Sequence, residues 1–212
     1  MDAPVSKYIP GFEALEYHLD EAGQEWYLAV CEGNDCVLDD DSEDEPQYQY
    51  HRGSGHGVLV LLQEDPSSDG GSGYDCQFRT VKRIPLPPRA HFLDYSALTL
   101  YPVPMNKERR AGRYGRLAVA SQENAAMWIG DFDFERVEFA GPGLVLHFPR
   151  SDNCLIEYCN VEGIAFLDEY RIVAVSDASK RRQPHYCKKM AESIALLVLP
   201  ERYERLEGKG TA

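Results

Sequence analysis

The amino-acid sequence predicts an all-β chain, and three observations support this expectation. Short segments rich in Val, Ile, Leu, Tyr and Phe recur along the 212 residues, with Gly, Pro and Asp between them. Helical periodicity is poor, since only residues 181–195 could form a helical turn, and Pro184 weakens that segment. Finally, one short sequence pattern occurs three times along the chain.

The recurring pattern has the same order of residue types in each copy. A Glu or Ser precedes a small residue and then Leu or Ile, and after a turn an apolar strand ends on Cys or Ser followed by a polar side chain. The copies are Glu13-Ala14-Leu15 with Cys31-Glu32, Ser96-Ala97-Leu98 with Ser121-Gln122, and Glu162-Gly163-Ile164 with Ser176-Asp177. A repeated supersecondary unit is the sequence signature of repeat architectures.

The copies divide the chain, taken as one domain over residues 1–212, into three blade-like units at about 8–91, 92–150 and 151–203. Strands are expected at 12–17, 26–31, 57–63 and 76–84 in the first unit, and at 95–101, 116–121, 126–131 and 144–148 in the second. The third unit offers 161–167, 171–176 and 193–199. Residues 5–9 form a spare strand that would complete its set of four. We therefore expect three four-stranded units.

The pattern resembles the repeat of phytase-like (esterase-like) β-propellers, with related repeats in propellers of the SMP-30/gluconolactonase and NHL types. Glu162-Gly163-Ile164-Ala165 and Val175-Ser176-Asp177 carry the resemblance most strongly. It implies six blades around a central channel, often with bound calcium, and hydrolase activity in some members. Three units amount to a partial or half propeller. A homodimer or a second half-propeller would complete the ring, unless the chain is part of a longer protein or an open set of sheets.

If the units are blades, corresponding side chains gather around one axis. Two rings of candidates follow from the alignment, with amides close by: Glu13, Ser96 and Glu162, then Glu32, Gln122 and Asp177, with Asn34 and Asn124. Carboxylate and amide oxygens suit calcium, so Glu13, Glu162 and Asp177 are the candidate metal ligands. Alternatively, these side chains bond backbone groups and hold the strands in register.

Six cysteines leave the disulfide state open. Two pairs share the spacing C-x4-C, which makes Cys31, Cys36, Cys154 and Cys159 the disulfide candidates. Six cysteines allow 15 pairings, and the sequence selects none of them. The alternative is six reduced and mostly buried thiols.

The charge balance restricts the partners. A formal net charge of -13 argues against binding of nucleic acid or an anionic membrane, while it permits cations and basic partners. The first ten residues lack a basic segment followed by an apolar one, so no signal peptide is expected in this chain. A cytosolic protein and a processed, secreted one are both compatible with this.

Known catalytic motifs give little support for an enzyme. The sequence has no G-x-S-x-G, no H-E-x-x-H, no P-loop and no G-x-G-x-x-G. We expect a propeller-type binding or scaffold protein whose loops recognise a small-molecule or protein ligand. The alternative is a calcium-assisted phytase-like or lactonase-like hydrolase of esters or phosphoesters, in which the metal activates water.

Overall fold

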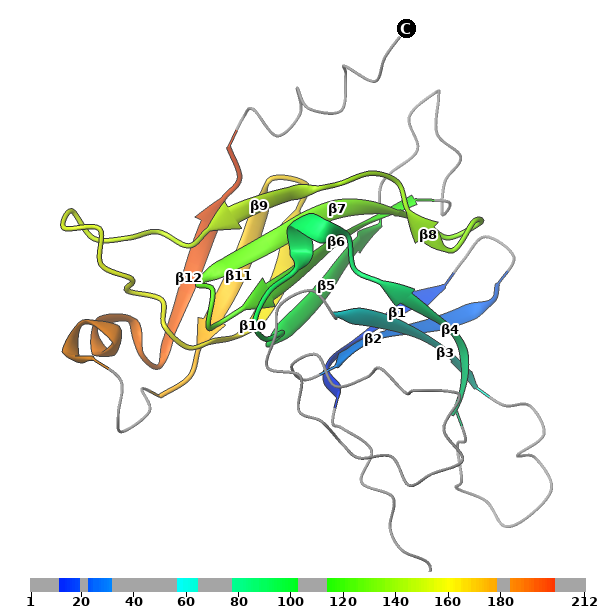
Figure 1. Ribbon diagram of the computed structural model, residues 1–212, viewed down its shortest axis with the longest axis horizontal. Helices are drawn as coiled ribbons and strands as arrows, with labels where there is room; N and C mark the ends of the chain where they lie inside the picture. The colour runs from blue at the N-terminus through cyan, green and yellow to red at the C-terminus, as the bar shows by residue number, and fades with distance from the viewer. Residues whose placement is uncertain are drawn as a thin grey trace, which may run out of the picture.

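The computed structural model describes residues 12–19, 23–31, 57–64, 78–102, 114–178 and 184–200. In these ranges the chain is all-β and forms three antiparallel sheets, none of which closes on itself. Sheet 2, drawn in green, lies between the other two (Figure 1). Within the described residues, no helix is long and apolar enough to cross a membrane.

Sheets 1 and 3 are meanders in which each strand pairs with the next one along the chain. Sheet 1 contains β1 (Phe12–Leu19), β2 (Glu25–Cys31), β3 (Val58–Glu64) and β4 (Phe78–Pro85). Sheet 3 contains β10 (Val161–Asp168), β11 (Arg171–Ser176) and β12 (Ser193–Val198). The expected fourth strand of this unit, residues 5–9, lies outside the described residues.

Sheet 2 has five strands where four were expected. It contains β5 (Ala97–Pro102), β6 (Tyr114–Ser121), β7 (Ala126–Asp133), β8 (Glu138–Phe139) and β9 (Leu144–His147). β8 pairs with the end of β7 and β9 with its beginning, so both lie along one edge of β7. The prediction missed β8 because Gly141-Pro142-Gly143 interrupts this outermost strand, and a two-residue segment has no readable periodicity.

Two short 3-10 helices complete the described chain. The first, η2 (Pro88–Ala90), joins sheets 1 and 2, and the second, η3 (His185–Met190), precedes β12. The helical turn expected within 181–195 is therefore a 3-10 helix that begins directly after Pro184. Proline suits this position because it supplies no N–H to the first turn and fixes φ near the helical value.

The strand register agrees with the alignment of the sequence pattern. Ala14 pairs with Val30 in sheet 1, Ala97 with Ala120 in sheet 2, and Gly163 with Val175 in sheet 3. The register shifts at Glu13 and again at Glu162, which places both carboxylates at bulges. Residues that the sequence pattern aligns therefore have equivalent pairing positions in the first two strands of each sheet.

Two apolar layers hold the sheets together. Leu28, Val30, Leu59 and Leu61 of sheet 1 pack in one cluster with residues of sheet 2 that include Leu98, Leu117, Val119, Ala126, Trp128 and Phe132. The opposite face of sheet 2 packs on sheet 3 through Ala118, Ala120, Met127, Ile129, Ile164, Ile172, Ala174 and Leu197. Because side chains alternate along a strand, sheet 2 buries both of its faces and sheets 1 and 3 each bury one against it.

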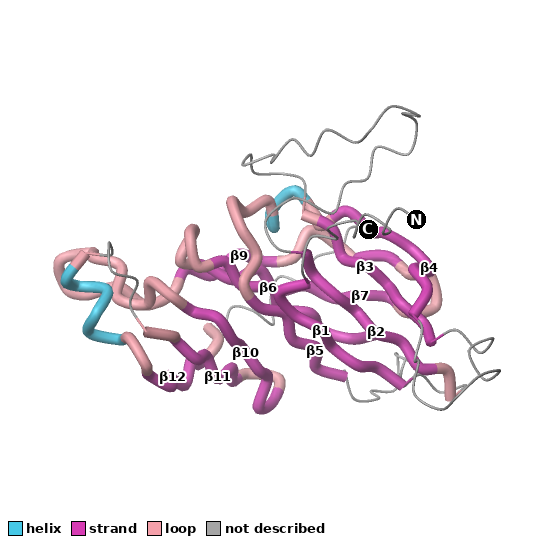
Figure 2. The backbone as a smooth tube through the Cα atoms, turned by 90° about the horizontal axis from the view of Figure 1, so that it is seen from below, coloured by secondary structure: helices cyan, strands magenta, loops and turns pink. Residues whose placement is uncertain are grey.

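The first strands of the three sheets lie beside one another, with β5 between β1 and β10 (Figures 1 and 2). Thr99 of β5 connects the three strands. Its hydroxyl hydrogen-bonds to the carboxylate of Glu16 on β1 and accepts a hydrogen bond from the backbone N–H of Phe166 on β10, at 3.4 Å. The inner edges of the three sheets therefore meet at one buried hydroxyl group.

Candidate functional site

Buried polar side chains gather at one end of sheets 2 and 3, where β5 and β10 begin and β6 and β11 end. We call this region the polar end and define it by Asp94, Ser96, Ser121, Asn160 and Ser176. The three serines and Asn160 are buried, and Asp94 is half-buried. Burying hydroxyl, amide and carboxylate groups is unfavourable unless they find partners, so their contacts decide what this region can do.

Asp94 holds the turn between β6 and β7. Its Oδ1 atom accepts hydrogen bonds from the Ser121 hydroxyl and, at 3.1 Å, from the backbone N–H of Glu123. Asn124 of the same turn accepts a 2.8 Å hydrogen bond from the backbone N–H of Leu93. The other carboxylate oxygen, Asp94 Oδ2, is buried and has no hydrogen-bond partner within the described residues.

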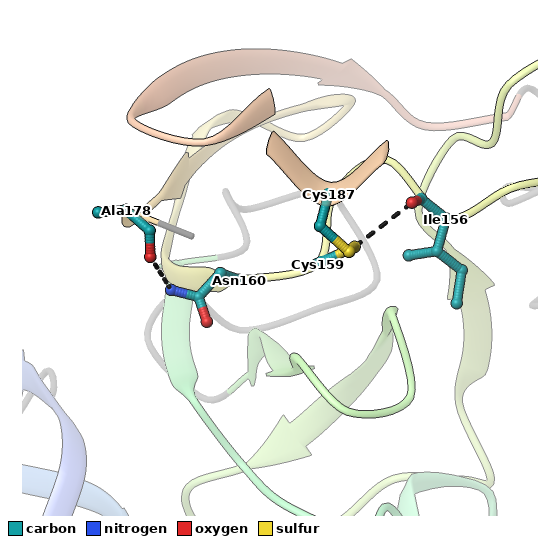
Figure 3. Close-up of a disulfide and its surroundings, with 5 residues drawn as sticks. All are labelled: Ile156, Cys159, Asn160, Ala178 and Cys187. Carbon is teal, nitrogen blue, oxygen red and sulfur yellow. Dashed lines mark hydrogen bonds between the residues drawn. A yellow bond between two sulfur atoms is a disulfide. The ribbon is translucent and has the colours of Figure 1, made fainter. Parts of the chain in front are cut away.

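Asn160 has the corresponding position in sheet 3 and is 4% exposed. Its Nδ2 atom donates to the backbone carbonyl oxygen of Ala178 at 3.2 Å (Figure 3), and its backbone carbonyl oxygen accepts from the backbone N–H of Asp177 at 3.0 Å. Asn160 Oδ1 is a second buried acceptor without a hydrogen-bond partner in the described part of the chain.

Asp94 and Asn160 have corresponding positions in sheets 2 and 3, and each contacts the segment that follows the neighbouring strand. Asp94 precedes Ser96 by two residues and Asn160 precedes Glu162 by two, and each bonds to the residue two places after the end of the neighbouring strand. The Ser96 hydroxyl donates to the carbonyl oxygen of Val161 at 2.7 Å and so joins the two sheets at this point. The arrangement presents one unpaired acceptor oxygen from each sheet.

The candidate site residues predicted from the sequence lie at different positions relative to the polar end. Gln122 and Asn124 lie in the β6–β7 turn, and Asp177 follows β11 with an exposed side chain. Glu162 is half-buried on β10, whereas Glu13 is exposed on β1 of sheet 1. Glu32 and Asn34 lie outside the described residues. In the ranges that the structure describes, no three His, Cys, Asp or Glu side chains are grouped so that they could hold a metal ion, and the calcium expectation stays a prediction.

The disulfide at this end differs from the spacing-based candidates. Cys159 bonds to Cys187 of η3, with 5.3 Å between their Cα atoms (Figure 3). Cys154 is a free, exposed cysteine. Cys154 was therefore a wrong candidate. It sits in a tight turn with φ of 59°, where its N–H donates to the carbonyl of Ser151, while the chain carries Cys159 onward to η3.

The other disulfide candidates are resolved only in part. Cys31 at the end of β2 is disulfide-bonded, and its partner is not among the described residues. Cys36 also lies outside them. The dashed line from Cys159 Sγ to the carbonyl oxygen of Ile156 in Figure 3 marks a 3.3 Å contact, because a disulfide sulfur has no proton to donate.

A titratable carboxyl group lies at the contact between β1 and β5. Burial raises the pKa of Glu16, and the hydrogen bonds from the Thr99 side chain and the Leu100 backbone oppose that increase without cancelling it. At the other end of β6 from the polar end, buried Arg116 lies 3.4 Å from Asp131 and 3.7 Å from Glu169. These groups connect the sheets, and we interpret them as structural.

Sequence reasoning missed Asp94, Asn160 and Glu16. A signal for the first two was present, since an Asp or Asn stands two residues before the aligned Ser96 and Glu162, whereas the first copy has Gly11 there. Glu16 gave no such signal because its partner, Thr99, comes from a different sheet.

Comparison of the chain with models of known families, with curated proteins and with solved structures finds no match.

Proposed function

We propose that the chain is a β-propeller-type binding protein, in which the three sheets act as blades around β1, β5 and β10 and the polar end carries the recognition surface. The blade assignment is supported by the meander order of the sheets and by the shared register of their first two strands. The adjacency of the three first strands is the third supporting feature, since blades of a propeller surround a common channel.

The observation that carries the binding proposal is the pair of unpaired acceptors, Asp94 Oδ2 and Asn160 Oδ1. A buried acceptor without a partner costs about 1–3 kcal/mol, so two at corresponding positions call for an explanation. A ligand that donates hydrogen bonds would satisfy both atoms. Positive charge on that ligand is favoured by the Asp94 carboxylate, by the exposed Glu123 and Asp177 nearby, and by the net charge of -13.

The proposal is tested by titrating the isotopically labelled protein with tetralysine and following amide signals by NMR. We expect the largest shifts at Glu123, Asn124, Ala178 and the side-chain amide of Asn160, with tetraglutamate as the charge-reversed control. Shifts spread evenly over the acidic surface would contradict a site at the polar end.

The matched variant is Asp94→Asn. Its Oδ1 atom can still accept from Ser121 and Glu123, while an NH2 group replaces the unpaired acceptor oxygen. We expect the fold to survive and tetralysine binding to weaken at least about tenfold, because an acceptor and a negative charge are both lost. Unchanged binding would remove Asp94 from the site.

A calcium-assisted hydrolase is the second candidate, and the chemistry of the same oxygens favours it. Carboxylate and amide oxygens are ligands that calcium accepts, and bound calcium could polarise an ester or phosphoester oxygen. This reading predicts that calcium raises the Tm of the wild-type protein and not that of Asp94→Asn. An equal Tm with and without calcium, together with no hydrolysis of a lactone or a phosphate monoester, would count against it.

A further inference from the structure

The outer face of sheet 3 is apolar and exposed. On β12, Ile194, Leu196 and Val198 are 77%, 55% and 71% exposed, while the alternate residues Ala195 and Leu197 are buried against sheet 2. Ile194 pairs with Val175 and Leu196 with Val173 of β11, so the neighbouring strand extends the same apolar face. A soluble chain rarely leaves such a continuous apolar surface without a partner.

By strand register, the outer face of sheet 3 corresponds to one face of sheet 1 and one face of sheet 2, both of which are buried inside the chain. Val173 and Val175 correspond to Leu28 and Val30, which pack sheet 1 on sheet 2. They also correspond to Ala118 and Ala120, which pack sheet 2 on sheet 3. Each sheet therefore uses this face to contact the sheet that follows it, and in sheet 3 the same face is exposed.

Sheet 1 presents the complementary surface on β1. Leu15 corresponds to Leu98 and Ile164, both of which are buried against the preceding sheet. In sheet 1 no sheet precedes β1 within the described chain, and Leu15 and Tyr17 are 58% and 48% exposed. Leu19, farther along β1, is exposed as well. One end of the stack thus exposes the contacting face. At the other end, Ala29, Cys31, Val58 and Val60 of β2 and β3 are buried on the receiving face, so it is the β1 strand that is exposed there.

We propose that a second copy of this chain covers both surfaces, with sheet 3 of each copy packed on β1 of the other. A two-fold axis makes the two contacts equivalent, so the pair is closed and does not extend into a filament. The exposed positions of β1 and β12 named above carry no charge, which lets two chains of net charge -13 meet through apolar contacts. The inference rests on the packing of the sheets and is independent of any ligand at the polar end.

Light scattering after size exclusion tests the proposal on the full chain. We expect a mass of twice 24.0 kDa, and we expect Ile194→Lys and Leu15→Lys each to give a monomer with the circular dichroism of the wild type. Both side chains are exposed in the single chain, so neither change should prevent folding. Leu155→Lys is the matched control, since Leu155 is exposed outside both surfaces, and it should remain a dimer.

Two results would overturn the proposal. A wild-type mass of 24.0 kDa at every concentration would show that a second copy does not cover these surfaces. A monomer from Ile194→Lys with a dimer from Leu15→Lys would show that sheet 3 pairs with sheet 3 of the partner and that β1 is not the receiving surface.

Discussion

The carboxyl group of Glu16 lies between β1 and β5, and burial raises its pKa above the ordinary value of 4.5. The folded protein therefore holds this proton to a higher pH than the unfolded chain does. The contribution of Glu16 to the free energy of unfolding is consequently largest below the ordinary carboxyl pKa and decreases as pH rises through the interval up to the raised pKa.

Glu16→Gln should remove this pH dependence while its side-chain oxygen still accepts from Thr99 and Leu100. We expect the Tm of the variant to exceed that of the wild type by about 1–4 °C near pH 8, and the two to agree near pH 4. Thermal unfolding at both pH values measures this. Glu64→Gln, a change at an exposed strand end, is the control, and an equal difference between Glu16→Gln and wild type at both pH values would contradict the assignment.

The junction between β8 and β9 depends on Gly143, which has φ of 62°. A Cβ atom there would lie 2.3 Å from Nε1 of the buried Trp128, whose indole donates to the carbonyl oxygen of Pro142 at 2.9 Å. Gly143→Ala should therefore cost about 2–4 kcal/mol, as the sum of backbone strain and overpacking.

Gly23→Ala is the matched control for Gly143→Ala. Gly23 has φ of 76°, but no atom lies within 4 Å of its would-be Cβ, so only the backbone strain of about 1–2 kcal/mol applies. Urea unfolding of both variants measures the difference. Equal losses would show that β9 does not pass over Trp128 as described.

The Cys159–Cys187 disulfide fastens the segment before β10 to η3, across a sequence separation of 28 residues. Cys159→Ser with Cys187→Ser should lower the free energy of unfolding by about 2–4 kcal/mol, because the open chain gains conformational freedom. Cys154→Ser should change it by less than about 0.5 kcal/mol, since Cys154 is free and exposed. A larger effect from Cys154 than from the pair would contradict the assigned bond.

The strands were predictable because local sequence determines them, whereas contacts between sheets were not. Segments rich in Val, Ile, Leu, Tyr and Phe located eleven of the twelve strands in the described residues, and the shared pattern aligned positions that have the same register. The pairing of Cys159 with Cys187 depends on where η3 lies in space, which spacing along the chain does not contain. The same is true of Thr99, which joins residues of three sheets.

The described part of the chain is a stack of three sheets whose inner strands meet at Thr99, and apolar side chains are exposed on β1 at one end and on β12 at the other. Ser96 links sheets 2 and 3 at the polar end, and Thr99 links all three sheets farther along β5. These links lie on the strands that would surround the axis of a propeller, so a propeller-type arrangement requires β1, β5 and β10 to be held together.

A double-mutant cycle on Glu16 and Thr99 tests that dependence most directly. The free energy of unfolding would be measured in urea for the wild type, Glu16→Ala, Thr99→Val and the double variant. We expect a coupling energy of about 0.5–3 kcal/mol, since the two side chains share a hydrogen bond between sheets 1 and 2. Losses that add to within about 0.3 kcal/mol would mean that β1 and β5 are not in contact, and would contradict the convergence of the three sheets.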